Sequence, residues 1–494
     1  MDTSTPEPDD ADLLMARAMA EDMDELRSSM RRIEQQLGQV GRALDDEVAA
    51  RTQGDDMVLK RLRPMIDGKR IDRQVGAVGR RVASRGVRAV RAVRPEPPAI
   101  MVICPRYPGG RYPYGGEFVR ARVRRYAEYG IRTHVVVTDL NGRRVRTSVV
   151  DGVKVHRTSR EMVAGLVDQL EPVLIGVHHM EPALWEVLQP FASTLPFVVW
   201  VHGFEARDWR ELAFNFDEDY LREHREFLDE LNRTRRSAMS EVFESENIHT
   251  VFVSHFMQGI AEDFVRRPPR HPHVIPNVVD DEVFPYRERS AEQRRRVLWV
   301  RSFNARNYAN DLSRDAVLRL ADSDHFAEMH VTIVGDGKYF DECTGPLHEL
   351  DNVTISRGFV SPERLAELHG DHGVMLVPSR WDSQGLTSLE AMSSGLVPVT
   401  TAVAAVPEYV PEDAGVLCPP EDAACLAEAV LALQDDPDQF LERSRRAAAA
   451  VRASCGVERT IGAECELVAS LAPRIRRSRW IRGRLQPMLS ALGR

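Results

Sequence analysis

The chain has 494 residues, 43% of them hydrophobic, which is enough for two or three domains with substantial cores. No apolar run reaches the roughly 20 residues of a transmembrane helix, and the acidic first residues lack the pattern of a signal peptide. The six cysteines are scattered without a Cys-x-x-Cys pair, which predicts free thiols in a reducing cytoplasm rather than a disulfide or zinc framework.

Charge is unevenly distributed along the chain. The net charge is −9, yet residues 60–94 carry 12 basic and two acidic side chains, and residues 474–494 carry seven basic and no acidic ones. Residues 1–59 carry six basic and 15 acidic side chains, and the long middle of the chain is also acidic. An acidic body argues against nucleic acid as a partner, whereas the two basic segments predict contact with an anionic membrane surface.

Residues 1–59 contain a heptad pattern. Apolar side chains alternate at spacings of three and four over four heptads, with charged residues between them: Ala16, Met19, Met23, Leu26, Met30, Ile33, Leu37, Val40 and Leu44. This pattern predicts a coiled coil that joins copies of the chain into a homo-oligomer. The alternative is an amphipathic helix docked on the body of the protein.

Residues 60–98 alternate arginine with valine. Several valines fall on one helical face, but Gly76, Gly79 and Gly86 weaken a helix there. Two interpretations remain, a basic linker and a helix lying in a membrane interface. The prolines at 95, 97 and 98 mark the boundary to the next domain.

Residues 99–285 have the pattern of a doubly wound α/β domain. Strands are predicted at 99–104, 133–138, 173–177, 197–201 and 250–254, with a glycine-rich loop at 105–116 and a helix from Glu117 to about Gly130. His178, His179 and His202 come directly after strands, where side chains line the ligand crevice of such sheets. We favour a functional role for His202 and a structural role for the other two.

Residues 286–470 repeat this pattern as a second α/β domain. Strands are predicted at 297–300, 331–334, 353–355, 374–377 and 396–400, and helices at 361–369, 386–394, 421–434, 436–452 and 457–470. The tail, 471–494, places apolar side chains on one face beside Trp480 and arginines. That face predicts a helix in a membrane interface, with packing on the protein as the alternative.

The turn between residues 377 and 386 is the most informative stretch. A buried strand ends at Val377, and the helix 386–394 begins directly after Gly385. A glycine between a strand's carboxyl end and a helix's amino end lies where α/β sheets bind ligands and where free N–H groups attract phosphate. Asp382 lies in the turn, and Glu390 lies one turn into the helix, where its carboxylate can accept hydrogen bonds from a ribose.

This stretch resembles the signature of retaining glycosyltransferases with the GT-B fold, of the family 4 or group 1 type. The resemblance rests on Gly385, Glu390-Ala391-Met392, Gly395 and Pro398. It implies two Rossmann-like domains that face a cleft. The family carries glutamate where this chain has Asp382, and there the first acid contacts the donor sugar while the second binds the ribose.

Further positions match the family pattern in order. The resemblance implies that Arg301 and Arg306 bind the donor diphosphate, although Val300 replaces the usual glycine. The remaining donor-binding positions that it implies are Gly115, Gly116, Gly358, Phe359, Val360, Gly385, Leu386 and Thr387. His202 matches a histidine near the reacting sugar, so that Asp382, Arg301, Arg306 and His202 form the predicted catalytic set.

The function implied is a metal-independent glycosyltransferase of the hexosyltransferase type. It uses a nucleotide-diphosphate sugar as co-substrate, needs no other cofactor, and transfers the sugar with retention to a glycan or lipid-linked acceptor in polysaccharide synthesis of the cell envelope or surface. We expect it in the cytoplasm at the inner face of the cell membrane. The alternatives are an epimerase or phosphorylase on the same fold, or a coiled-coil scaffold whose site is inactive because of Asp382.

Overall fold

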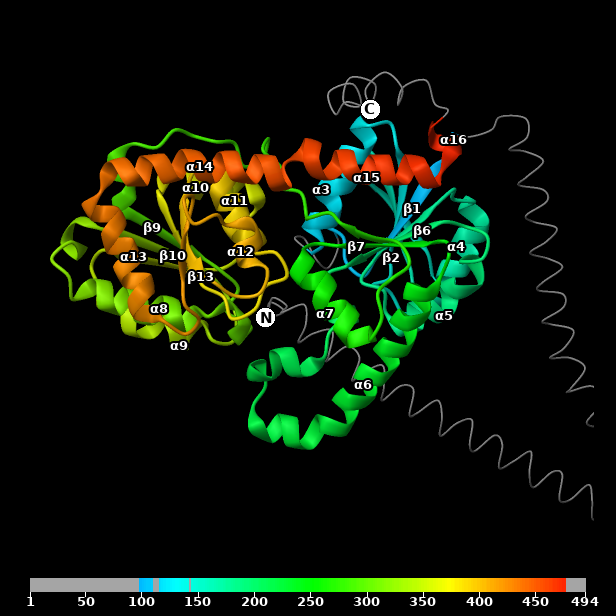
Figure 1. Ribbon diagram of the computed structural model, residues 1–494, viewed down its shortest axis with the longest axis horizontal. Coiled ribbons are helices and arrows are strands. Elements are labelled where there is room, and N and C mark those ends of the chain that lie inside the picture. Colours follow the sequence, from blue (N-terminus) through cyan, green and yellow to red (C-terminus); the bar gives the residue numbers. More distant parts are fainter. Residues whose placement is uncertain (1–96, 110–114, 142–143, 477–494) are drawn as a thin grey trace, which may run out of the picture. The chain divides into compact units, whose positions relative to one another are not determined.

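The computed structural model describes residues 97–109, 115–141 and 144–476. The predicted coiled coil, the basic segment 60–94 and most of the basic tail lie outside these residues. The described residues from Pro98 onward belong to one compact unit that contains two sheets, each with helices on its faces (Figure 1). This arrangement confirms the predicted α/β class with two Rossmann-like domains.

The first sheet has eight strands in the order β3-β4-β2-β1-β5-β6-β7-β8. All neighbouring strands pair in parallel except β3 and β4, which form an antiparallel hairpin at one edge. Strands such as β1 are continuous apolar runs because both faces of a parallel sheet are covered. The strands are β1 (Ala99–Cys104), β2 (Arg132–Val137), β3 (Arg146–Val150), β4 (Val153–Arg157), β5 (Ile175–His178), β6 (Phe197–Val201), β7 (Ile248–Phe252) and β8 (Pro272–Val274).

Helices cover both faces of this sheet. One face packs against α4 (Val163–Leu170), α5 (Pro182–Leu188), α6 (Glu218–Glu244) and α7 (His255–Val265). The other face packs against α3 (Glu117–Glu128) and α15 (Val457–Leu471). Two short helical segments, η3 (Phe204–Ala206) and η4 (Trp209–Asn215), connect β6 to α6.

The second sheet has six parallel strands in the order β11-β10-β9-β12-β13-β14. The strands are β9 (Arg296–Val300), β10 (His330–Gly335), β11 (Val353–Arg357), β12 (Val374–Leu376), β13 (Val397–Thr401) and β14 (Val416–Cys418). The helices around it are η6 (Arg306–Tyr308), α8 (Asn310–Ala321), α9 (Phe340–Thr344), α10 (Pro362–Asp371), α11 (Leu386–Ser394), α12 (Val406–Tyr409), α13 (Ala423–Asp435) and α14 (Pro437–Cys455).

The helix α15 packs on the first sheet, although the sequence places it in the second domain. Its Glu464 is 1% exposed and accepts hydrogen bonds from Arg122 Nε at 2.8 Å, from the Tyr126 hydroxyl at 2.6 Å and from Trp200 Nε1 at 3.0 Å. A buried carboxylate needs such partners, because an unpaired charge in a core is strongly destabilising. In Figure 1, α15 runs beside α3.

Both sheets have one point at which the strand order reverses. In the first sheet this point lies between β1 and β5, and in the second between β9 and β12. Helices that follow the two strands leave toward opposite faces there, so the carboxyl ends of the strands border a crevice. The residues that follow β9 and β12 are therefore the first place to look for a ligand site.

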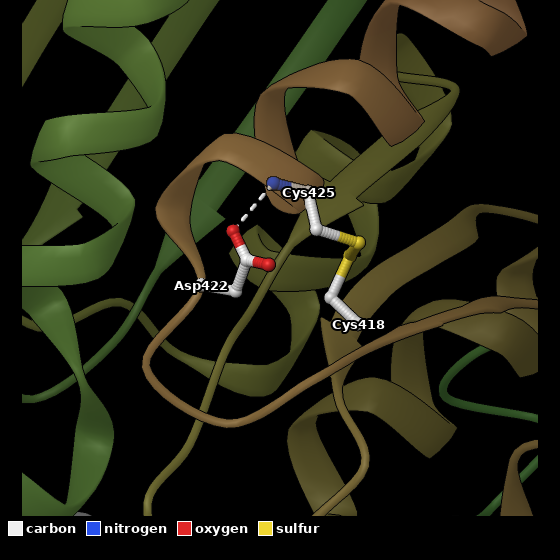
Figure 2. The surroundings of a disulfide bond; sticks show 3 residues. All are labelled: Cys418, Asp422 and Cys425. Atoms are coloured by element: carbon white, nitrogen blue, oxygen red, sulfur yellow. Dashed lines mark hydrogen bonds between the residues drawn. A yellow bond between two sulfur atoms is a disulfide. The ribbon is translucent and has the colours of Figure 1, made fainter.

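The cysteine prediction is wrong for one pair. Cys418 ends β14, Cys425 lies in the first turn of α13, and the two form a disulfide with their Cα atoms 5.7 Å apart. Figure 2 shows how Asp422 accepts a hydrogen bond from the Cys425 N–H at 2.9 Å and so begins the helix beside Cys418. The short turn between strand and helix brings the thiols together, although their spacing matches no Cys-x-x-Cys motif. Cys104, Cys343, Cys455 and Cys465 are free and buried.

We expect loss of this disulfide to lower the free energy of unfolding by about 2 kcal/mol, because the bond closes a short loop in the unfolded chain. Cys425→Ser is the preferred variant, since Cys425 is only partly buried whereas Cys418 is fully buried. Denaturant unfolding with and without reductant measures the change. The double variant Cys418→Ser/Cys425→Ser is the control, because reductant should then have no effect. Peptide mapping that finds both thiols free in the unreduced protein would contradict the assignment.

Candidate functional site

The turn that follows β12 is built around Gly385. This residue precedes α11 with a φ of 79°, a left-handed conformation that glycine adopts without strain. The first N–H groups of a helix have no partner within the helix, so those at the start of α11 point toward the crevice at the end of the strands. The predicted residues Leu386 and Thr387 are the first two of this helix.

Arg301 directly follows β9 and points at this helix start. Its guanidinium donates to Thr387 Oγ1 at 3.3 Å and to Ser379 Oγ, and it lies 4.9 Å from the centre of the Tyr308 ring. Arg301 is 8% exposed, while its buried Nε has no hydrogen-bond partner in the described part of the chain. These contacts hold a positive charge beside the N-terminus of α11, which is the arrangement expected of an anion site.

Asp382 stabilises the turn itself. Its Oδ1 accepts hydrogen bonds from the backbone N–H groups of Gln384 at 3.2 Å and Gly385 at 2.7 Å. Its Oδ2 lies 3.6 Å from Arg301 Nη2. One carboxylate oxygen therefore orders the backbone before α11, and the other faces the arginine. A contact between Asp382 and a donor sugar stays a prediction.

Glu390 lies in the second turn of α11 and is only partly buried. Its carboxylate has no hydrogen-bond or ion-pair partner among residues 97–109, 115–141 and 144–476. Burial, followed by the charge of Glu117, raises the pKa of Glu390 to about 8, while Arg301 acts in the opposite direction. A carboxylate without a partner and with a shifted pKa, on a helix that starts at the carboxyl ends of the strands, is a candidate for ligand binding.

Glu117 was not among the predicted site residues. It is the first residue of α3, after Gly116, whose φ of 76° and close approach to the Arg106 carbonyl admit only glycine. Gly115 lies directly before Gly116 in the same turn. Burial raises the pKa of Glu117, against the charge of Arg120. The charge of Glu117 contributes to the raised pKa of Glu390, and the predicted Gly115 and Gly116 directly precede Glu117 in the chain.

Arg306 lies apart from Arg301 in the structure. It is exposed, and its guanidinium lies 5.0 Å from the centre of the Tyr339 ring, on which the Lys338 ammonium also packs at 4.6 Å. Arg301 turns toward α11 and Arg306 toward the residues after β10, so the two predicted diphosphate ligands share no partner. A common role on one ligand stays a prediction.

The residues after β11 form the outer end of the crevice. The Gly358 N–H donates to the Gly335 carbonyl at 2.9 Å, and Gly358 has a φ of 140°. Phe359 is 43% exposed, while Val360 packs partly buried against the core beside α10 and α11. An exposed phenylalanine just after the edge strand β11 has a free ring face on which a nucleobase can stack.

His202 belongs to a cluster at the end of β5 and β6. The ring nitrogens His178 Nδ1 and His202 Nε2 lie 2.9 Å apart, and the Phe118 ring lies 4.7 Å from the His202 ring. Burial lowers the pKa of His202 well below its usual range, and the neighbouring His179 and His178 lower it further. The ring is therefore neutral at pH 7. The backbone N–H of His202 donates to Glu205 Oε1 at 2.7 Å. The structural role predicted for His178 fits its stacking on Trp200, with ring centres 4.5 Å apart.

Further residues that the sequence did not single out join the two halves of the compact unit. The Glu408 carboxylate accepts from the backbone N–H groups of His255 at 2.9 Å and Phe256 at 2.6 Å, at the start of α7. Ser254 Oγ donates to the Ser383 carbonyl at 2.8 Å. Contacts between segments that are distant in the sequence leave no local pattern, so these residues could not be predicted from it.

Gln384 makes the other link from this turn. Its side chain accepts from the Asn277 N–H at 2.7 Å and donates to the Asn277 carbonyl at 3.1 Å. The residues flanking Gly385 are thus held from three sides, by Asp382, Ser254 and Asn277. A site with so many supporting bonds is preorganised before any ligand binds.

Two features are absent from the described part of the chain. None of its helices has the length and apolarity to cross a membrane. It also holds no group of three or more His, Cys, Asp or Glu side chains placed to bind a metal ion.

Comparisons with known proteins agree on the kind of fold. Residues 294–436 match the family described as glycosyl transferases group 1. A 90-residue stretch is 30% identical to the sulfoquinovosyl transferase of Arabidopsis thaliana, and it covers 18% of this chain and 17% of that protein. The match to this curated relative is thus well short of its full length.

Solved structures match over a larger part of the chain. Sucrose-phosphate synthase from Thermosynechococcus elongatus has a TM-score of 0.59 at 18% identity, covering 76% of this chain and 99% of that one. HepE of Anabaena in complex with UDP-glucose has a TM-score of 0.57 at 14% identity, covering 75% and 100%. At these identities the likeness establishes the fold alone.

Proposed function

Because residues 294–436 match the family of group 1 glycosyl transferases and the chain has the GT-B fold, we propose that it transfers a sugar from a nucleoside-diphosphate donor to an acceptor hydroxyl. The observation that carries the proposal is the cluster at the start of α11. There Arg301 and the free N–H groups of the helix face the same crevice as the unpartnered carboxylate of Glu390.

In this proposal the donor diphosphate lies on Arg301 and the N-terminus of α11. Negative charge grows on the diphosphate as the bond to the sugar breaks, and fixed positive charge that is already in place stabilises the transition state. Arg306 joins this task when its side chain leaves Tyr339 for the ligand. The protein's own cations thereby supply the charge stabilisation, so we propose a reaction that needs no divalent metal.

The nucleoside occupies the other side of the crevice. Glu390 accepts hydrogen bonds from the ribose hydroxyls, and the base lies along Gly358 and Val360 with the exposed Phe359 ring beside it. The sugar lies toward His202 and the glycines 115 and 116. We further propose retention of configuration, with an oxygen of the leaving phosphate taking the proton of the acceptor. Since HepE, which shares the fold, was solved with UDP-glucose, that sugar nucleotide is the first donor to test.

Incubation of the purified protein with labelled sugar nucleotides in EDTA tests this function. We expect release of nucleotide and transfer of the sugar to an acceptor. Ring epimerisation or phosphorolysis would favour another enzyme of the same fold, and binding without turnover would favour an inactive scaffold. Activity that disappears in EDTA and returns with magnesium or manganese would contradict the metal-independent mechanism.

We also propose that the protein forms oligomers through residues 16–44 and works at the inner face of the cell membrane, on glycan or lipid-linked acceptors of polysaccharide synthesis. The heptads support the first point and the basic segments support the second.

Removal of residues 477–494 should weaken binding to anionic vesicles, and removal of residues 60–94 as well should abolish it. Each arginine near such a surface contributes about 1 kcal/mol, so binding should also fall as salt rises. The deletion begins at 477 because Ile475 is 2% exposed and packs in the core of the first domain. Vesicle flotation of the two deletion variants measures the effect. The proposed membrane contact would be contradicted if the fraction of protein that floats with the vesicles changed neither with salt nor with either deletion.

A further inference from the structure

A cavity of about 420 Å³ lies beside Arg306, outside the cluster of Arg301 and Glu390. Its lining comes from η4, from the start of α6, and from the segments after β9 and β12. The lining residues are Phe214, Phe216, Asp217, Glu218, Arg306 and Arg380. The volume falls in the range of small-molecule sites, which is roughly 300–1,000 Å³.

Hydrogen bonds fix the walls of this cavity relative to one another. Asn215 Oδ1 at the end of η4 accepts from the Asn307 N–H at 3.0 Å. The Arg380 N–H donates to the Asn307 carbonyl at 2.8 Å, and Arg380 Nη1 donates to the Arg306 carbonyl at 3.0 Å. Three segments far apart in the sequence therefore meet in a bonded junction, and the cavity is built into the structure.

The apolar part of the lining is aromatic. Phe214 is 37% exposed, one of the few large hydrophobic side chains that are exposed in the described part of the chain. Phe216 is partly buried and stacks on Tyr220, with ring centres 5.2 Å apart and planes 10° apart. The stacking fixes the Phe216 ring, while the exposed Phe214 ring is open to a flat apolar surface such as the C–H face of a pyranose.

The charged part of the lining favours a ligand that donates hydrogen bonds. Asp217 and Glu218 are exposed, and their carboxylates have no partner among residues 97–109, 115–141 and 144–476. The guanidinium of Arg380, in contrast, is engaged by two carboxylates, those of Asp311 at 2.7 and 2.8 Å and Glu421 at 2.6 and 2.8 Å. The two unpaired carboxylates repel an anionic group placed against their side of the cavity and accept hydrogen bonds from hydroxyl groups, while Arg306 lines the side that the proposed function assigns to the donor diphosphate.

We propose that this cavity is the subsite for the acceptor, and that it binds a neutral pyranose ring of a glycan. The ring stacks on Phe214 and donates hydroxyl bonds to Asp217 and Glu218. The inference rests on the proposed function, because Arg306 lines both this cavity and the predicted diphosphate site. It extends that function by naming a sugar, rather than an anionic headgroup, as the group in direct contact with the enzyme.

Saturation-transfer NMR with simple methyl glycosides tests the subsite. The probes are the methyl glycosides of glucose, galactose, mannose and N-acetylglucosamine, with methyl glucuronide as the anionic counterpart of the glucoside. We expect contact with at least one neutral glycoside and weaker contact with the glucuronide. Phe214→Ala and Glu218→Gln should each weaken glycoside binding about tenfold.

Two variants serve as matched controls. Val149→Ala removes another exposed hydrophobic side chain, 66% exposed on β3, and Glu223→Gln removes an exposed carboxylate further along α6. Neither should change glycoside binding. The proposal is overturned when no neutral glycoside contacts the native protein, when the glucuronide binds better, or when Phe214→Ala and Glu218→Gln bind like the controls.

A titration of the same samples with UDP separates this proposal from the proposed function. UDP binding that persists in Phe214→Ala and Glu218→Gln while glycoside binding falls supports the acceptor subsite. Failure of UDP, ADP and GDP to bind the native protein would instead contradict the donor site, and the glycoside result would still decide the subsite.

Discussion

Replacement of Arg301 by alanine is expected to lower turnover about 10²- to 10³-fold, the cost of removing one preorganised charge partner of a transition state. The guanidinium is nearly buried and held by Thr387, Ser379 and Asp382, so its position does not depend on the ligand. Because the charge on the diphosphate grows as the bond breaks, kcat should fall more than the affinity for the donor. Steady-state kinetics with the active sugar nucleotide measures the two effects.

Two further variants separate chemistry from folding. Arg301→Lys keeps the charge but loses the planar fork, so its activity should lie between those of the native protein and the alanine variant. Arg364→Ala removes an arginine that pairs with Glu367 on the surface of α10 and should leave kcat unchanged. A loss of kcat in Arg301→Ala that follows its loss of thermal stability would contradict the role in catalysis.

The variant Glu390→Gln should bind nucleoside diphosphate about 10- to 100-fold more weakly, because charge-assisted hydrogen bonds to the ribose contribute about 1.5–3 kcal/mol. The effect should depend on pH. The pKa of Glu390 is about 8 without ligand, and hydrogen bonds from hydroxyl groups favour the ionised form. Affinity of the native protein should therefore rise with pH up to about 8, with release of protons on binding below that pH.

Calorimetry in two buffers with different ionisation enthalpies measures this proton release. Glu390→Gln should remove it. Glu117→Gln should shift the pH dependence of binding downward, since the charge of Glu117 is the second cause of the raised pKa. Binding by the native protein that releases no protons between pH 6 and 8 would contradict the contact between Glu390 and the nucleoside.

The raised pKa of Glu390 also affects folding: the free energy of unfolding should fall with rising pH, whereas the affinity for the nucleotide should rise. A carboxyl group whose pKa is raised on folding binds its proton more tightly in the folded state. The proton on Glu390 contributes fully to the stability of the fold below the usual carboxyl pKa, and this contribution is lost as pH rises toward 8. Glu390→Gln should therefore flatten the fall in stability over this window, which separates an effect on folding from the effect on ligand affinity.

The sequence predicted the buried parts of the fold well. The strand Ala99–Cys104 and the helix Leu386–Ser394 have the predicted bounds, because continuous apolar runs and flanking glycines mark such elements directly. The hairpin of β3 and β4 was missed. The strand β3 is almost entirely exposed at the edge of the sheet, so it carries no apolar run.

Prediction of the site was limited by contacts between distant segments. The glycine before α11 and the carboxylate of Glu390 follow from local pattern. The capping bonds of Asp382, the proximity of Glu117 to Glu390, and the burial of Glu464 against Arg122, 342 residues away in sequence, depend on the folded chain. The disulfide of Cys418 was missed for a related reason, since it depends on how tightly the chain turns from strand to helix.

The central claim is that the start of α11 holds the diphosphate and ribose of a sugar nucleotide. Calorimetric titration of UDP, ADP and GDP in EDTA, into the native protein and into the double variant Arg301→Ala/Glu390→Gln, tests it most directly. We expect saturable binding of at least one nucleotide to the native protein and a loss of at least about 10²-fold in the double variant, with its fold retained. Equal affinities of the two proteins for that nucleotide, or no binding to either, would contradict the account.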